Sequence, residues 1–116
     1  ELKDANKFEA NALKKYGLIN EIAPRYRSTY FAHIFSGGYS SGYYSYVHSA
    51  VLDSDGFEAF KETGDVFDAN LAEKLREHVY EKGSTEEAMD LYVQFRGKKP
   101  MIEPLLKVRG LDGGSE

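Results

Sequence analysis

The chain has 116 residues, of which 41% are apolar and 29% charged, so a single domain with a modest core is the expected size class. Its 15 lysines and arginines against 19 acidic residues give a net charge of −4, which argues against nucleic acid as the main partner. No apolar run is long enough to span a membrane, and the lack of cysteine excludes disulfides and thiolate zinc sites.

The N-terminal part of the chain is predicted to begin with a helix. Apolar residues at helical spacing indicate this helix over 4–16, and Gly17 is expected to end it as a glycine C-cap. The stretch 18–27 contains Pro24 and shows no period, so we expect a connector there. Residues 28–35 are apolar and aromatic, and their pattern fits either a short strand or a buried turn of helix.

A long helix is predicted over 40–62, after a flexible joint at 36–38. The joint contains two adjacent glycines, which remove the Cβ restriction on the backbone. The segment 53–56 reads Asp-Ser-Asp-Gly and is expected to kink or divide the helix. Asp and Ser compete for local backbone hydrogen bonds, and glycine costs about 1 kcal/mol relative to alanine in a helix.

Two more helices follow, each with a predicted start signal. Either Asp68 or Asn70 is expected to cap the first of them. Ser84 and Glu87 are three residues apart and fit a capping box for the second, which Gly97 should end.

The C-terminal part of the chain is also predicted to be helical, so the expected fold class is mainly α. A last short helix is predicted over 102–108, and a frayed tail over 112–116. We therefore expect a single helical domain of about five helices over residues 1–111. The chain starts at Glu1 with no initiator methionine or signal segment, so we expect it to be a piece of a longer protein, from either the cytoplasm or the periplasm.

The strongest local signal is a segment rich in glycine and tyrosine. Four of the nine tyrosines fall within positions 39–46, and the glycine spacing matches neither dinucleotide nor P-loop motifs. On a helix, Tyr43 and Tyr46 would project from one face, which Tyr39 would extend by one turn. Phenols donate hydrogen bonds without a counter-charge and suit a developing oxyanion, with His33 as a second donor. The alternative is that these rings only pack together.

Other chemistry is less favoured by the sequence. The histidines at 33, 48 and 78 are not spaced three or four apart, and no HExxH occurs, so no complete zinc site is expected. No GxSxG elbow is present either. Arg25 and Arg27 flank Tyr26 and could grip a carboxylate in a bidentate fork, although surface ion pairing is the alternative.

These residues together resemble a known family. His33-Ile34-Phe35-Ser36-Gly37-Gly38-Tyr39, followed by Gly42-Tyr43-Tyr44-Ser45-Tyr46, is similar to the C-terminal part of the thimet oligopeptidase and oligopeptidase A family of zinc metallopeptidases. The likeness is greatest to its bacterial peptidyl-dipeptidase branch. It continues into 95–100 and 105–111 and covers roughly residues 15–111. The chain departs from the usual pattern at 47–50, which puts local packing in doubt.

The resemblance implies a helical enzyme with a deep channel and a zinc ion. The metal would be held by the two histidines of an HExxH helix and by a later glutamate, all upstream of Glu1. We therefore expect zinc in the full-length enzyme and none in this chain, which alone should be inactive. The expected function is hydrolysis of oligopeptides with release of C-terminal dipeptides.

The resemblance also implies roles for particular residues. Tyr43 and Tyr46 would act in catalysis as oxyanion and substrate contacts, and His33 would bind substrate. A mobile loop that also meets the substrate would contain Gly37, Gly38 and Tyr39. Arg25, as a clamp for the terminal carboxylate of the substrate, is a separate inference from its side chain.

The expected partners follow from this reading. They are short peptide substrates and the remainder of the parent catalytic domain, with neither nucleic acid nor a membrane. Alone, the chain could self-associate through exposed apolar surface. The alternative is a stand-alone helical module that binds peptides without catalysis, since tyrosine-rich, glycine-hinged surfaces suit adaptable binding.

Overall fold

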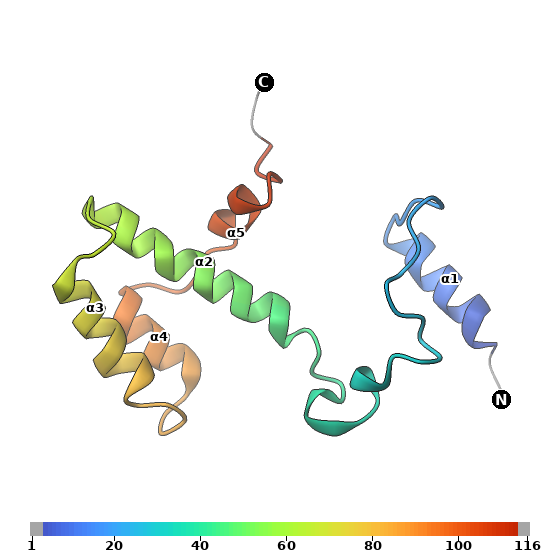
Figure 1. Ribbon diagram of the computed structural model, residues 1–116, viewed down its shortest axis with the longest axis horizontal. Coiled ribbons are helices and arrows are strands. Elements are labelled where there is room, and N and C mark those ends of the chain that lie inside the picture. Colours follow the sequence, from blue (N-terminus) through green and yellow to red (C-terminus); the bar gives the residue numbers. More distant parts are fainter. Residues whose placement is uncertain (1–3, 114–116) are drawn as a thin grey trace. The chain divides into compact units, whose positions relative to one another are not determined.

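A computed structural model describes residues 4–113 of the chain, and these residues divide into two compact units. The first unit comprises the described residues up to Tyr44, and the second comprises those from Ser45 onward (Figure 1). The expectation of a single domain over 1–111 stays a prediction, because two such units can belong to one domain. Of the tail predicted to be frayed, residues 114–116 lie outside the described part of the chain.

Helix α1 (Ala5–Lys15) opens the first unit, close to the predicted bounds. The side chain of Asp4 accepts a hydrogen bond from the Lys7 amide at 3.1 Å and caps the helix. Gly17 follows the helix with φ +77°, a left-handed conformation that glycine adopts without strain. The glycine stop is therefore confirmed.

The aromatic stretch after the connector forms helical turns and no strand, but it is not the buried turn that was expected, because Tyr30 and Phe35 are more than 60% exposed. A 3₁₀ helix, η1 (Ala32–Ile34), lies in this stretch, and a second one, η2 (Gly37–Tyr39), contains the paired glycines. The carbonyl of Ala32 accepts from the amides of Phe35 and Ser36, which closes the first turn. No strand occurs anywhere in residues 4–113.

Helix α2 (Ser45–Thr63) opens the second unit and corrects two predictions. It begins at Ser45 and not at residue 40, because Ser41 has φ +55° and the Gly42 amide donates to the Tyr39 carbonyl in a tight turn. It is also not divided at 53–56. The side chain of Asp55 is engaged by α4, as described below, and therefore does not compete for its own backbone.

Helix α3 (Ala69–Leu75) continues directly into five residues of π-helix, η3 (Arg76–Tyr80). Its N-cap is Asp68, whose Oδ1 accepts from the Leu71 amide at 2.7 Å. Of the two predicted caps, Asp68 is therefore the one used.

Replacing Asp68 by alanine should lower the free energy of unfolding by about 1 kcal/mol, because one helix-end donor loses its partner. Asn70 is the matched control: it lies inside the helix, and Asn70→Ala should change stability by less than about 0.5 kcal/mol. Urea denaturation followed by circular dichroism measures both. Equal effects of the two substitutions would contradict the assignment of the cap.

Helix α4 (Ala88–Arg96) shows that the predicted capping box is wrong. Its N-cap is Glu87, whose carbonyl accepts from the Asp90 and Leu91 amides, and no side chain caps this end. Ser84 lies too early, since the turn at Lys82 still occupies the chain there. Gly97, at φ +79°, ends the helix as predicted.

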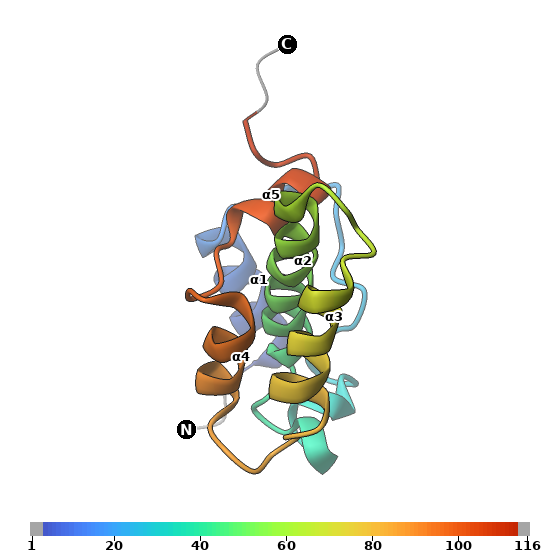
Figure 2. The ribbon, with the colours of Figure 1, turned by 90° about the vertical axis from the view of Figure 1, so that its left-hand side faces the viewer.

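Helix α5 (Glu103–Val108) is the predicted last helix, and it packs on α2. Helices α3 and α4 lie side by side (Figure 2). The core of the second unit is small: Ala59, Tyr92 and Phe95 are buried, and partly buried apolar side chains of α2, α3 and η3 surround them. The prediction of a mainly α chain of about five helices is confirmed.

Among the helices of residues 4–113, none combines the length and the apolar character that a membrane crossing requires.

Candidate functional site

Five aromatic rings of the first unit form one connected group, which we call the ring cluster: Tyr26, Phe31, His33, Tyr39 and Tyr43. The rings of Tyr26 and Phe31 stack with their centroids 5.0 Å apart. The His33 ring lies 5.9 Å from Phe31 and 6.3 Å from Tyr39. Three of the predicted site residues, at positions 33, 39 and 43, are thereby brought together.

Tyr43 is the centre of the ring cluster. Its ring meets those of Phe31, His33 and Tyr39 at centroid distances of 4.8, 5.7 and 5.9 Å. All three contacts are edge-on, the geometry in which the positive edge of one ring faces the negative face of another. Tyr43 is half-buried, so its ring orientation is set by its neighbours while the residue still reaches the surface.

The loop that contains the paired glycines is folded back on itself by backbone hydrogen bonds. The amide of Ser41 donates to the carbonyl of Ile34 at 3.3 Å, and that of Ser40 to Gly37 at 3.2 Å. Gly37 has φ +71°, where a side chain would be strained, and open space surrounds the positions of Gly37 and Gly38 where a Cβ would stand. The loop is thus ordered by its own hydrogen bonds and by the packing of Tyr39, while nothing in the described part of the chain packs against its two glycines.

Arg25 and Arg27 behave differently from each other. The guanidinium of Arg25 lies 5.3 Å from the centroid of the Tyr26 ring, a cation–π contact at the edge of the ring cluster, and the residue is exposed. Arg27 pairs with Glu9. Ion pairing, the alternative considered for both arginines, therefore holds for Arg27. The role of Arg25 as a carboxylate clamp stays a prediction.

Tyr46 is not placed as the helical spacing predicted. It lies in the first turn of α2 and belongs to the second unit, whereas Tyr43 precedes the helix and belongs to the first. Tyr39 is in η2. The expectation of one helix face shared by the three tyrosines is therefore wrong, because the turn at Ser41 interrupts the helix that it required. Catalytic roles for Tyr43 and Tyr46 stay predictions.

Sequence reasoning missed Glu9, a buried carboxylate on α1 that is 9% exposed. Its Oε2 accepts from the amide of Ser28 at 2.6 Å and from the Ser28 hydroxyl at 2.7 Å, and Arg27 binds Oε1. The hydrogen bonds from Ser28, with the nearby Arg27 charge, lower the pKa of Glu9. The apolar spacing that predicted α1 did not indicate a buried carboxylate. Phe8, one of its apolar residues, is 60% exposed, whereas the neighbouring Glu9 is buried.

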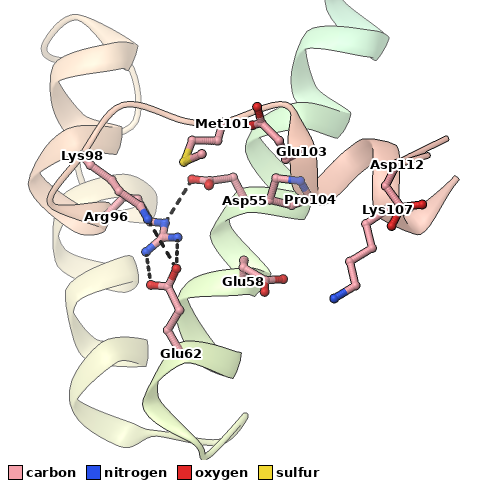
Figure 3. Close-up of a pocket in the computed structure, with 10 residues that line it drawn as sticks. All are labelled: Asp55, Glu58, Glu62, Arg96, Lys98, Met101, Glu103, Pro104, Lys107 and Asp112. Atoms are coloured by element: carbon pink, nitrogen blue, oxygen red, sulfur yellow. Dashed lines mark hydrogen bonds and ion pairs between the residues drawn. The ribbon is translucent and has the colours of Figure 1, made fainter. Parts of the chain in front are cut away.

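The second unit contains a charged network that the sequence also concealed. Asp55 is 1% exposed, and its Oδ2 accepts from the Tyr92 hydroxyl at 2.6 Å and from Arg96 Nε at 3.0 Å. The Arg96 guanidinium also binds the Glu62 carboxylate in a bidentate contact, with hydrogen bonds of 2.6 and 2.8 Å (Figure 3). It thereby joins two positions of α2 through one residue of α4. A cavity of about 430 Å³ lies beside this network.

The protonation of these groups follows from their surroundings. Hydrogen bonds from Arg96 lower the pKa of Glu62 to about 2. Burial and the adjacent Asp55 raise the pKa of the Tyr92 phenol above its ordinary value, which keeps it a neutral donor. Hydrogen bonds with the two carboxylates raise the pKa of Arg96. Glu62 therefore stays ionised and Arg96 protonated at neutral pH, and Lys98 adds a second cation beside Glu62, with its Nζ 3.4 Å from Oε1.

The described residues do not fit a zinc site. Within 4–113, no three histidine, aspartate or glutamate side chains lie close enough together to hold a metal ion. The described part of the chain can therefore supply hydrogen-bond donors and charges to a site, but no set of metal ligands.

The ring cluster and its loop bring phenols, an imidazole and an arginine together in the first unit. Residues 1–111 match Peptidase family M3, and the chain belongs to this family. It is 43% identical to dipeptidyl carboxypeptidase of Escherichia coli over 96% of the chain and 16% of that protein.

Other relatives show the same likeness over less of the chain. Oligopeptidase A of Escherichia coli is 40% identical over 72% of the chain and 12% of its own length. The probable cytosolic oligopeptidase A of Arabidopsis thaliana is 40% identical over 70% of the chain and 12% of its own length. The chain thus spans about one sixth or less of these curated relatives.

Proposed function

We propose that this chain is the C-terminal part of a zinc metallopeptidase that hydrolyses oligopeptides and releases C-terminal dipeptides. The zinc and its ligands are assigned to the remainder of the parent protein. The observation that carries the proposal is the contact of His33, Tyr39 and Tyr43 in one cluster beside the glycine loop. Membership of Peptidase family M3 and the likeness to a dipeptidyl carboxypeptidase support it.

In this proposal the chain supplies donors to the substrate. The Tyr43 phenol donates a hydrogen bond to the substrate carbonyl oxygen, and the bond strengthens as that oxygen gains negative charge in the transition state. Tyr46 provides a second phenol from the first turn of α2. His33 contacts the substrate from within the ring cluster, and Arg25 receives its terminal carboxylate. The glycine loop covers the bound peptide.

The test is cleavage of defined peptides by the full-length parent protein. A peptide with a free C-terminus should lose dipeptides in sequence, which mass spectrometry detects. Internal cleavage without dipeptide products would show that the parent protein has the specificity of an oligoendopeptidase instead. Binding without any cleavage would favour the stand-alone peptide-binding module.

Arg25→Ala in the full-length protein should raise KM about tenfold for peptides with a free C-terminus, because one charge-assisted contact is lost. KM for the same peptides with an amidated C-terminus should stay within about twofold, since they carry no carboxylate to bind. Lys14→Ala, which removes an exposed charge of α1, is the control. An equal rise for both kinds of peptide would refute the clamp.

Closure of the glycine loop should be visible in hydrogen exchange. When a peptide-like inhibitor binds the full-length protein, amides in 37–42 should exchange more slowly, because the loop leaves solvent. Amides of α4 serve as the internal reference, since that helix belongs to the other unit. Unchanged exchange in 37–42 at saturating inhibitor would count against closure.

A further inference from the structure

Glu9 joins α1 to the chain that leads into the ring cluster. Its two carboxylate oxygens accept from two consecutive residues, Arg27 and Ser28, which are 18 and 19 positions away in the sequence. The Arg27 guanidinium is also held by Asn6, one turn earlier on α1, at 3.3 Å. A buried carboxylate with three donors fixes both the position and the direction of the backbone that it binds.

The backbone held in this way is the start of a tight turn. The carbonyl of Arg27 accepts from the amides of both Tyr30 and Phe31, at 3.0 Å each. Phe31 is the ring at the end of this turn, and it contacts three members of the ring cluster: Tyr26, His33 and Tyr43. A continuous path of contacts within one unit therefore runs from the Glu9 carboxylate to the Tyr43 ring.

We propose that Glu9 is a positioning residue for the ring cluster, which is the proposed substrate-binding face of the first unit. Glu9 holds the turn at 27–31, and thereby the Phe31 ring that orients Tyr43 and His33. This inference rests on the proposed function, because the face has a role only if the parent protein binds peptides. Glu9 itself has no contact with substrate. It acts through Ser28 and Arg27, so it belongs to the support of the site and not to its chemistry.

The choice of glutamate at this position is explained by the donors that meet it. The Ser28 amide, the Ser28 hydroxyl and the Arg27 guanidinium are all donors, so the group between them must be a pure acceptor. The lowered pKa of Glu9 keeps it ionised at neutral pH. Glutamine could still accept from the Ser28 amide but would lose the ion pair, whereas alanine would leave all three donors without an acceptor.

The first test measures ring geometry and needs no enzymatic activity. In the 116-residue chain with labelled aromatic residues, NMR should show cross-relaxation between the ring protons of Phe31 and Tyr43. Glu9→Ala should remove or strongly weaken these signals, and Glu9→Gln should retain a large part of them. The Tyr92–Phe95 contact of the second unit, at 5.9 Å, should persist in both variants, which shows that the second unit is unaffected by a substitution in the first.

Glu21→Ala is the matched control, since Glu21 is an exposed acidic residue of the same unit. It should leave the Phe31–Tyr43 signals unchanged. The inference is overturned if the signals are absent in the unmodified chain, if Glu9→Ala leaves them intact, or if Glu21→Ala removes them to the same extent.

The second test measures the consequence for catalysis in the full-length protein. Glu9→Ala should lower kcat per titrated active site by about ten- to a hundredfold, as expected when a catalytic group is misplaced by a fraction of an ångström to one ångström. Glu9→Gln should recover a large part of the loss. Counting active sites with a tight inhibitor separates misplacement from loss of folded protein, which would leave kcat per site unchanged and overturn the inference.

The two tests distinguish a failure of the proposed function from a failure of the positioning role of Glu9. If the full-length protein cleaves no peptide, the proposed function is wrong, and the NMR signals still decide whether Glu9 orients Tyr43. If cleavage is robust and Glu9→Ala leaves kcat per site within twofold, the positioning role is wrong while the function stands.

Discussion

Replacing Tyr43 by phenylalanine in the full-length protein should lower kcat by about 10²–10³, the usual effect of removing one oxyanion donor. Phenylalanine keeps the ring, and with it the edge-on contacts to Phe31, His33 and Tyr39. Only the phenolic hydrogen bond is lost. Because this bond is strongest in the transition state, KM should change by less than about threefold. Steady-state hydrolysis of a fluorogenic peptide measures both constants.

Tyr44→Phe is the matched control for this result. Tyr44 is the next residue in the chain, is 73% exposed and lies outside the ring cluster. Its substitution should leave kcat within about twofold. A Tyr43→Phe protein that retains turnover within a few-fold of the unmodified protein would show that Tyr43 serves packing alone. Equal losses in the two variants would point to a general effect on the loop.

Replacing Arg96 by alanine should lower the free energy of unfolding of the second unit by about 3–5 kcal/mol. Arg96 has a side chain only 4% exposed and is the charge partner of Asp55, which is 1% exposed. Its removal leaves a buried carboxylate with the Tyr92 hydroxyl as its remaining partner. Guanidinium or urea denaturation, followed by circular dichroism of the chain, measures the change.

Arg76→Ala is the comparison that isolates burial. Arg76 also pairs with two carboxylates, Glu73 and Glu81, but all three side chains are about half exposed. Its loss should therefore cost less than about 1 kcal/mol. The expected difference between the two arginines comes from desolvation and not from the number of ion pairs. A loss below about 1 kcal/mol for Arg96→Ala would show that water reaches Asp55 readily.

The helices of this chain could be predicted where their ends depend on local residues. Gly17 and Gly97 stop α1 and α4 because each adopts a left-handed backbone that glycine tolerates. Asp68 caps α3 through its own side chain. The start of α2 was missed because Ser41, a residue with no such preference, takes a positive φ. The false capping box had the correct spacing but lay in the preceding turn.

The candidate site could be predicted only in part, and for a related reason. The motif identified His33, Tyr39 and Tyr43, which are close in sequence and also in space. The groups that hold them were missed, because Glu9 and Ser28 are 19 residues apart. The charged network of the second unit was missed for the same reason, because Asp55 and Arg96 are 41 residues apart. A local sequence pattern does not indicate which residue, far away in the sequence, will donate a hydrogen bond to a buried carboxylate.

The boundary between the two units falls after Tyr44, inside the glycine and tyrosine motif itself. A motif that reads as one line of sequence is therefore shared between two bodies: Tyr43 belongs with α1, and Tyr46 belongs with α2. The two phenols have no common helix to transmit an effect from one to the other. A double-mutant cycle of Tyr43→Phe and Tyr46→Phe would therefore measure the coupling free energy between a residue of the first unit and a residue of the second.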